Sequence, residues 1–166
     1  MSEPAELVGR PVRDSVSEYS ELAMPNDANP LGTLFGGKVM HLVDLAASLA
    51  AARHARRPVV TASVDHLEFI HPVHIGQLLV LRSSVNRVFR TSMEVGVRVC
   101  VEDLRTGDIR HTCSAFLTFV ALGDDGRPAV IAPVIPETGE EKRRFAQAGD
   151  RRRYRLELRA RSKSSE

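Results

Sequence analysis

The chain has no tryptophan, and aromatic residues make up only 5% of its 166 residues. Its interior must therefore be built from aliphatic side chains, chiefly those of Val, Leu, Ile and Ala. Cysteine is also scarce: Cys100 and Cys113 are the only two, and neither belongs to a CxxC or Cys/His metal pattern. Both lie in apolar stretches, so we expect buried, reduced thiols that behave as small hydrophobic residues.

Long apolar runs are missing as well. Polar residues interrupt the best candidate for a membrane span, residues 38–54. The N-terminal stretch MSEPAELVGRPVRDS has neither a positive start nor an apolar core, so it does not look like a secretory signal peptide. We therefore expect a cytoplasmic protein with no membrane partner.

A strong charge of either sign is lacking, because Lys and Arg number 23 and Asp and Glu number 21. This balance gives no electrostatic argument for a nucleic-acid partner. The charge is uneven, however, because residues 137–166 hold ten Lys or Arg and six Asp or Glu. This basic end leaves two interpretations open: it contacts phosphate groups, or it is a solvated helix packed across a neighbouring subunit.

One segment, KVMHLVDLAASLAAARH (residues 38–54), is strongly helical. Its residues are good helix formers, and Arg53 and His54 lie in the last turn, where the helix dipole favours cations. The segment is apolar nearly all round, so we expect most of its sides to be buried. The polar exceptions share one stripe, because they are spaced by three and four residues: His41, Asp44 and Ser48.

Alternation of apolar and polar residues dominates the rest of the chain and predicts strands. Successive strands without intervening helices imply an antiparallel meander, and with the helix they imply an α+β fold in which a curved sheet wraps the helix. Such a sheet leaves an edge strand exposed, and pairing with a second copy would cover it. One strand is predicted before the helix and four after it, at residues 15–25, 59–70, 78–89, 91–103 and 111–122.

The length fits a single domain. Residues 1–14 carry proline and charge without a period, and we expect a flexible N-terminus there. The domain itself is predicted to span residues 15–135. The remaining residues, 136–166, form a charged C-terminal helix or tail, with Glu140 and Arg144 one helical turn apart.

Four motifs occur in order along the chain: AMPNDANPLGTLFGGKVMHLVD, VVTASVDHLEFIHPVHIGQ, RTSMEVGVRV and AFLTFVAL. Together they resemble the hotdog-fold acyl-CoA thioesterases, in particular the broad-range bacterial and cytosolic acyl-CoA hydrolases. The resemblance implies a hotdog fold, in which a long central helix is wrapped by a curved antiparallel β-sheet. It also implies a dimer whose sheets join edge to edge, commonly three such dimers in a homohexamer, with each active site at the dimer interface. No cofactor is implied, because coenzyme A belongs to the substrate.

The resemblance matches Asn29 and Asp44 to two residues of the family's active site. A carboxylate among Leu and Ala could act as a general base on water or as a nucleophile that forms a mixed anhydride. The alternative is a structural Asp44 satisfied by arginine or backbone donors. Asn29 could orient water or the thioester, or it could simply form an Asx-turn before Pro30. In the hotdog arrangement it would face Asp44 of the partner subunit.

Gly36 and Gly37 stand where the loop becomes the helix, so their N–H groups can approach a carbonyl oxygen closely. We expect the Gly37 N–H to stabilise the oxyanion, while plain packing of the helix start is the alternative. His41 is expected to be a bystander. Thr61 and Ser63 are further candidates for substrate contact, and we expect them to share a strand face with Asp65. The segment Arg90, Thr91 and Ser92 is the candidate for coenzyme contact. Phe89 precedes this segment, at a position where the family often has glycine.

Three functions compete at this point. The leading one is an acyl-CoA thioesterase that releases a fatty acid and coenzyme A. An acyl-thioester hydratase or dehydratase is disfavoured, because those enzymes use a histidine in the loop–helix region and DANPLGTLFGG has none. A non-catalytic acyl-CoA sensor would need no helix aspartate and usually carries a DNA-binding segment, whereas no helix-turn-helix pattern is visible. The six histidines show no metal-ligand spacing.

Overall fold

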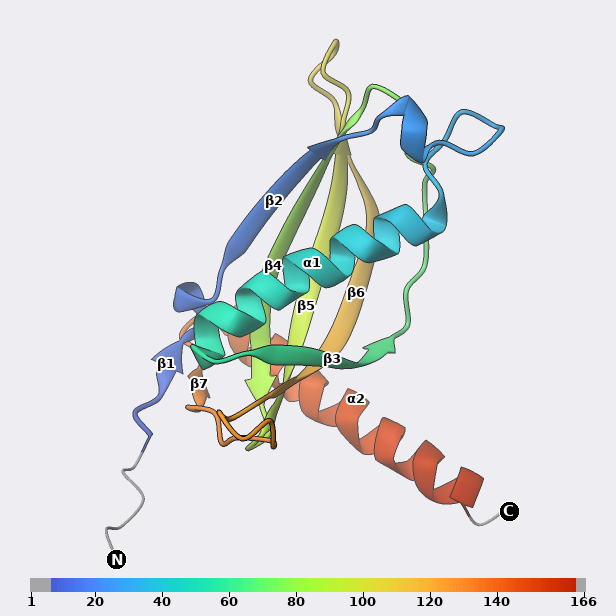
Figure 1. The fold of residues 1–166 in the computed structure, drawn as a ribbon. Helices are drawn as coiled ribbons and strands as arrows, with labels where there is room; N and C mark the ends of the chain where they lie inside the picture. The colour runs from blue at the N-terminus through green and yellow to red at the C-terminus, as the bar shows by residue number, and fades with distance from the viewer. Residues whose placement is uncertain (1–6, 164–166) are drawn as a thin grey trace, which may run out of the picture.

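The computed structural model describes residues 7–163 and shows a curved antiparallel sheet with one long helix on each face (Figure 1). Helix α1 (Gly36–Ala55) lies in the concave side, and helix α2 (Gly139–Lys163) lies across the outer side. The predicted α+β class and hotdog arrangement are confirmed. The sheet strands are β2 (Ser17–Leu22), β3 (Val59–Asp65), β4 (Leu78–Val88), β5 (Ser92–Glu102) and β6 (Ile109–Ala121).

Helix α1 sits close to the sheet because its inner face is lined by alanine and valine. The Ser83 hydroxyl reaches from β4 to donate to the Ala46 carbonyl oxygen at 2.7 Å. The helix ends where Arg56 adopts a left-handed conformation with φ of 52°, and the Arg56 N–H bonds the Ala52 carbonyl at 2.8 Å. The residues buried against the sheet are Val39, Leu42, Val43, Ala46, Ala47, Ala50, Ala51 and His54.

The strand order is β2-β4-β5-β6-β3, which corrects one expectation. A meander would place β3 beside β4, but β3 instead crosses to the far edge and pairs with β6, from Val59 opposite Ala121 to Asp65 opposite Phe116. The long connection at residues 66–77 makes this crossing possible. Within the described chain β3 pairs with β6 alone, so its other edge is free.

The core between α1 and the sheet is aliphatic, as the composition predicts. Four alternate residues of β5 face it and are at most 5% exposed: Val95, Val97, Val99 and Val101. Cys113 is also fully buried, and burial raises the pKa of its thiol to about 11. Cys100 is only half-buried, and both cysteines are free thiols.

The N-terminal region is ordered earlier than expected. Short strand β1 (Arg10–Pro11) pairs in parallel with β7 (Val134–Ile135), and a 3-10 turn, η1 (Val12–Asp14), follows it. Residues 1–6 of the segment predicted to be flexible lie outside the described chain. Strand pairing starts before Ser15 because the segment that precedes α2 offers it a partner.

Helix α2 forms as predicted after Pro136, and its start carries a capping box. The Glu141 N–H donates to the Thr138 hydroxyl at 3.2 Å, and the Thr138 N–H donates to Glu141 Oε2 at 3.1 Å. The predicted pair of Arg144 and Glu140 is present at 2.5 Å. Neither this helix nor any other among residues 7–163 combines the length and apolarity needed to cross a membrane.

A buried ion pair attaches α2 to the sheet. Glu94 of β5 points to the outer face and is fully buried beneath the helix. Arg151 donates two hydrogen bonds to its carboxylate, at 2.7 and 3.0 Å, and the Asn86 side chain donates a third at 3.0 Å. The Arg151 guanidinium also lies 3.6 Å from the ring centroid of Phe116. Arg155, one turn further along the helix, pairs with Asp65 at the end of β3.

We predict that acid weakens the fold through His54. Its ring Nε2 lies 2.8 Å from the Ala132 carbonyl oxygen and must donate to it, and burial lowers the pKa of the imidazole. The unfolded chain binds a proton below about pH 6.5, before the folded chain does, so the free energy of unfolding should fall as the pH drops through this range. Urea denaturation at pH 7.5 and pH 5.5 measures the loss. In His54→Gln the difference should shrink, and an unchanged difference would assign the acid sensitivity to other groups.

Candidate functional site

Asp44 lies halfway along α1 and points away from the helix's buried face. Its carboxylate is half-buried, and the Thr61 hydroxyl of β3 donates to Asp44 Oδ1 at 2.6 Å. Among residues 7–163 no ion pair involves this aspartate, and its Oδ2 atom has no hydrogen bond from the protein. One carboxylate oxygen is therefore oriented by β3 while the other remains available to a ligand.

A β-bulge in β3 separates the two strand residues that were expected to share a face. Thr61 lies opposite Phe119, on the core side, whereas Ser63 lies opposite Thr118. Thr118 is in turn opposite Glu94, which points to α2. Residues directly opposite one another in an antiparallel pair share a face, so Ser63 and Asp65 point outward. Ser63 is thus removed from the Asp44 side, and the reason is the register shift between Thr61 and Ser63.

Asn29 is held inside the loop that precedes α1. Its Oδ1 accepts from the N–H groups of Leu31 and Thr33 at 2.9 and 3.2 Å, and its Nδ2 donates to the Thr33 hydroxyl at 2.8 Å. The predicted Asx-type turn is therefore present. A carboxamide nitrogen carries two hydrogens, so one N–H remains for a ligand while the loop fixes its direction.

Gly36 and Gly37 form the first turn of α1 and are both exposed. Among residues 7–163 no backbone or side-chain acceptor binds their N–H groups, as expected at a helix start without a side-chain cap. A methyl group at Gly37 would meet nothing within 4 Å, whereas one at Gly36 would lie 3.4 Å from the Phe69 ring. The Gly37 N–H therefore has no acceptor among the described residues, and it lies at the positive end of the helix dipole.

Lys38 joins the loop, the helix and β2, a role that the sequence reading missed. Its Nζ lies 2.7 Å from Glu21 Oε1 and 3.3 Å from Asp27 Oδ2, and the Tyr19 hydroxyl donates to the other Glu21 oxygen at 2.7 Å. The Lys38 hydrogen bond lowers the pKa of Glu21, and Glu21 raises the pKa of Lys38. A lysine in a first helical turn opposes the dipole, and that misfit was the available sequence signal.

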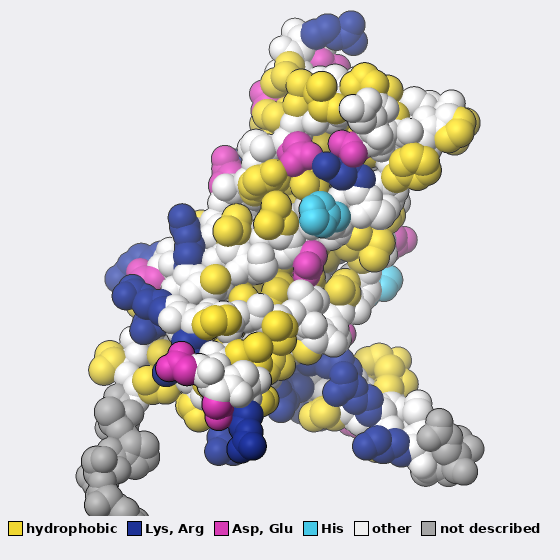
Figure 2. All heavy atoms as spheres, viewed as in Figure 1, with side chains coloured by type: hydrophobic (Ala, Val, Ile, Leu, Met, Phe, Trp, Pro, Cys, Tyr) yellow, Lys and Arg dark blue, Asp and Glu magenta, His cyan; other side chains and the backbone are white. Residues whose placement is uncertain are grey.

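Among residues 7–163, the other two polar residues of the stripe on α1 form no hydrogen bond with Asp44. Ser48 donates to the carbonyl oxygen of Leu45 within its own helix, at 2.7 Å, and His41 is exposed. Figure 2 shows acidic, basic and histidine side chains set among hydrophobic ones over the N-terminal half of α1. The stripe is therefore a surface open to a ligand or to another protein chain, with Asp44 at its centre.

The segment predicted to contact the coenzyme lies at the other end of α1 from Asn29. Arg90 and Thr91 form the β4–β5 hairpin and Ser92 begins β5, at the end of the sheet where α1 ends and β3 begins. Arg90 has a left-handed φ of 82°. Phe89, the departure from the family pattern, carries the Arg152 guanidinium 4.4 Å from its ring centroid. Asn29 sits at the opposite end of α1, so a single chain does not bring the two segments together.

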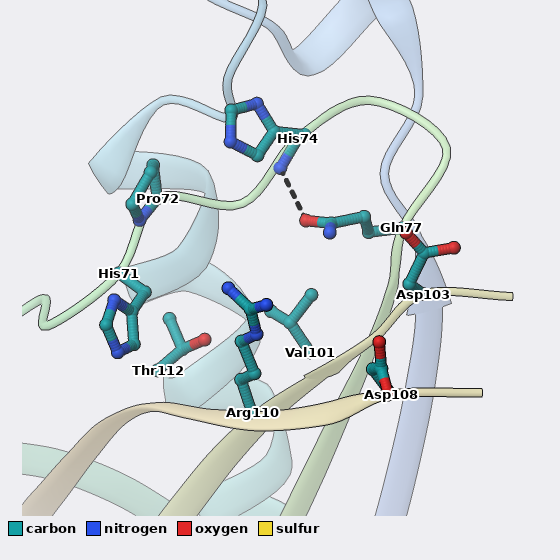
Figure 3. Close-up of a pocket in the computed structure, with 9 residues that line it drawn as sticks. All are labelled: His71, Pro72, His74, Gln77, Val101, Asp103, Asp108, Arg110 and Thr112. Atoms are coloured by element: carbon teal, nitrogen blue, oxygen red, sulfur yellow. Dashed lines mark hydrogen bonds between the residues drawn. The ribbon is translucent and has the colours of Figure 1, made fainter. Parts of the chain in front are cut away.

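A separate cleft of about 320 Å³ lies between the 66–77 crossover and the β5–β6 hairpin (Figure 3). Arg110 stands at its centre, and the only hydrogen bond drawn within it joins the His74 N–H to Gln77 Oε1 at 2.9 Å. Asp103 and Asp108 are engaged in the hairpin turn through Arg105 and Thr106. None of the predicted catalytic residues lines this cleft.

Comparison with known proteins adds to this geometry. Residues 31–107 match the family model described as "Thioesterase superfamily". Over 117 residues the chain is 47% identical to the uncharacterized acyl-CoA thioester hydrolase YkhA of Bacillus subtilis, covering 70% of this chain and 68% of that one.

Two solved structures are similar over nearly the whole chain. The structure of an apo-hexameric acyl-CoA thioesterase has 41% identity and a TM-score of 0.89, covering 93% of this chain and 99% of the other. An acyl-CoA hydrolase from Staphylococcus aureus, in complex with butyryl coenzyme A and coenzyme A, has 33% identity and a TM-score of 0.87, covering 94% and 95%. That hydrolase has also been solved with an aspartate, an asparagine or a threonine replaced by alanine.

Proposed function

Because the chain belongs to the acyl-CoA thioester hydrolases of the thioesterase superfamily, we propose that it hydrolyses fatty acyl-CoA to a free fatty acid and coenzyme A with Asp44 as the reacting carboxylate. The observation that carries this assignment is the contact between the Thr61 hydroxyl and Asp44 Oδ1, which leaves Oδ2 open to a ligand. The S. aureus hydrolase was altered at an aspartate, an asparagine and a threonine, the same three residue types as Asp44, Asn29 and Thr61.

In the general-base form of the reaction, Asp44 Oδ2 takes a proton from water as the water oxygen attacks the thioester carbonyl carbon. The carbonyl oxygen becomes an oxyanion, the carbon–sulfur bond then breaks, and the coenzyme thiolate receives the proton. In the nucleophilic form, Asp44 attacks the carbonyl itself, and water cleaves the resulting anhydride. Either route needs only a carboxylate, water and hydrogen-bond donors, so the proposal requires no metal or cofactor.

The Gly37 N–H supplies the oxyanion donor in this proposal. It has no acceptor within residues 7–163, it is exposed, and it lies at the positive end of the helix dipole, where negative charge is stabilised. Lys38 holds the loop against β2 through Asp27 and Glu21, and so fixes the position of Asn29.

A second copy of the chain completes the site. Thr61 is exposed and Asp44 only half-buried, and both lie beside the free edge of β3. In one chain the Asp44 carboxylate is open to water. A second chain paired at β3 would cover it and make it a stronger base by removing that water. We place Asn29 of the partner subunit across from Asp44, in a dimer that assembles further into a trimer of dimers. Arg90, Thr91 and Ser92 bind the coenzyme in this assembly, which we place in the cytoplasm.

The test is direct. Purified protein is mixed with acyl-CoA of increasing chain length and a thiol reagent, and released coenzyme A is followed by absorbance. Steady release with any chain length supports the hydrolase. Tight binding of acyl-CoA without release would favour a sensor, and water addition to an unsaturated acyl-CoA without release would favour a hydratase.

Replacing Gly37 by alanine is expected to separate stability from activity. The added methyl group meets no atom within 4 Å, so the fold should be kept or stabilised by about 0.4–1 kcal/mol. The same methyl group would stand where the thioester carbonyl approaches, so kcat/KM should fall at least about tenfold, a loss of about 1.4 kcal/mol in transition-state binding. The control is Gly139→Ala, which also has open space at the start of a helix but lies on α2. Equal activity in the two variants would remove Gly37 from the site.

A further inference from the structure

Helix α2 crosses the strands of the sheet in spatial order and reaches the edge formed by β3. Arg87 of β4 donates to the Phe145 carbonyl oxygen at 3.4 Å, near the start of the helix. Arg151 then bonds Glu94 of β5, and Arg155 pairs with Asp65 of β3. These contacts follow the order β4-β5-β6-β3, and Figure 1 shows the helix passing behind β3 and continuing outward.

The helix is longer than the sheet it covers. From residue 145 to residue 155 it rises about 15 Å. Three strand spacings, from β4 to β3, amount to about 14 Å. Arg155 therefore stands over the edge strand, and residues 156–163 extend about 12 Å beyond it. We refer to residues 156–163 as the overhang.

Burial along α2 stops at the same place. Ala148 is buried and Arg151, Arg152 and Arg155 are half-buried, whereas every residue of the overhang is exposed. The overhang continues a helix that is already formed, so its helicity does not depend on packing of its own. Apolar side chains are nevertheless displayed there, with Leu156 49% and Leu158 44% exposed. Packing on another surface would remove these side chains from water.

The free edge of β3 indicates which surface this is. The edge carries exposed Val60 and Val64, each 46% exposed, beside unpaired backbone groups. Any second sheet that pairs there continues the first one, so its outer face comes to lie beneath the overhang. A reach of about 12 Å corresponds to two or three strand spacings, which covers the first two strands beyond the seam. Those strands would be β3 and β6 of a second copy.

We propose that the overhang packs on the outer face of β3 and β6 of a second copy of this chain, beside that copy's own α2, so that each α2 bridges the seam between two sheets. The inference rests on the homodimer of the proposed function and adds to it a second, reciprocal contact. Arg155 and Asp65 fix the direction in which the overhang leaves its own sheet. Leu158, three residues after Arg155 and therefore on the same side of the helix, supplies the apolar contact.

A truncated protein ending at Arg155 tests how much the overhang contributes to the stability of the dimer. It keeps the contacts to Glu94 and Asp65, so its circular dichroism should show a folded chain. Sedimentation velocity over a range of concentrations should give a dimer dissociation constant at least ten times that of the full chain, and Leu158→Glu should act in the same direction. Leu104→Glu is the matched control, because Leu104 is 55% exposed on the β5–β6 hairpin, away from α2. An unchanged dissociation constant in the truncated protein would overturn the proposal.

Cross-linking tests the position. Leu158 is replaced by the photoreactive p-benzoylphenylalanine in chains of normal and of heavy isotopic label, which are mixed, irradiated and digested. Mixed-isotope links from residue 158 to β3 or β6 are expected. Links within one chain only, or a chain that is monomeric throughout, would overturn the proposal. Neither measurement depends on turnover. An inactive protein with mixed-isotope links would therefore contradict the proposed hydrolase activity and still support the bridging helix.

Discussion

Asp44→Asn is expected to abolish the release of free coenzyme A from acyl-CoA, lowering kcat on the order of a thousandfold. The amide has nearly the shape of the carboxylate, and its oxygen can still accept the hydrogen bond from the Thr61 hydroxyl. It can neither take a proton from water nor attack a thioester. Because Asp44 forms no ion pair among the described residues, the variant should remain folded, with acyl-CoA binding largely retained.

Two controls bracket this result. Asp150→Asn removes a carboxylate from the exposed face of α2, where it pairs with Arg153, and should leave turnover unchanged. Thr61→Val keeps the carboxylate but removes the donor that orients it, so activity should fall about tenfold rather than vanish, the equivalent of one ordinary hydrogen bond. Normal turnover by Asp44→Asn would mean that the reacting group is elsewhere.

Arg151→Met is expected to cause the largest loss of stability, about 3–5 kcal/mol in the free energy of unfolding. Glu94 is fully buried and receives two of its three hydrogen bonds from Arg151, so the variant leaves an uncompensated carboxylate beneath α2. Of the hydrogen bonds that Glu94 receives from the described residues, the one from the Asn86 amide would remain. Urea denaturation at pH 7.5 measures the loss.

The matched control is Arg153→Met on the same helix. Its guanidinium pairs with Asp150 in an exposed site, so the change should be at most about 1 kcal/mol. The double variant Glu94→Met with Arg151→Met should recover much of the lost stability, because it removes the buried charge together with its partner. If the single and double variants were equally unstable, the loss would come from packing on Phe116 and not from the buried charge.

Much of the molecule follows from local patterns. Strong helix formers around one polar stripe predicted α1 within two residues of its start, and alternation predicted every strand of the sheet. The charged end after Pro136 was predicted as a helix, and it is one. Asp44 was predicted to be functional because a carboxylate is unusual in an otherwise apolar helix. These features depend on residues close together in the chain, whose spacing alone fixes which side of an element they occupy.

Other features depend on which distant segments meet, and only the tertiary structure decided them. Strand alternation does not say that β3 pairs with β6, and it assumes an unbroken period that the bulge before Ser63 interrupts. Two ion-pair clusters likewise join residues from separate elements. Lys38 contacts Glu21 and Asp27, and Arg151 pairs with the buried Glu94.

The sequence by itself determined the element types and the carboxylate that makes the chemistry conceivable, because both are set by short-range backbone preference and side-chain polarity. The tertiary structure decided which oxygen of that carboxylate the Thr61 hydroxyl binds, which two strands form the sheet edges, and where α2 passes beyond β3. Those outcomes depend on long-range packing and on hydrogen bonds between strands far apart in the chain, which no local pattern encodes.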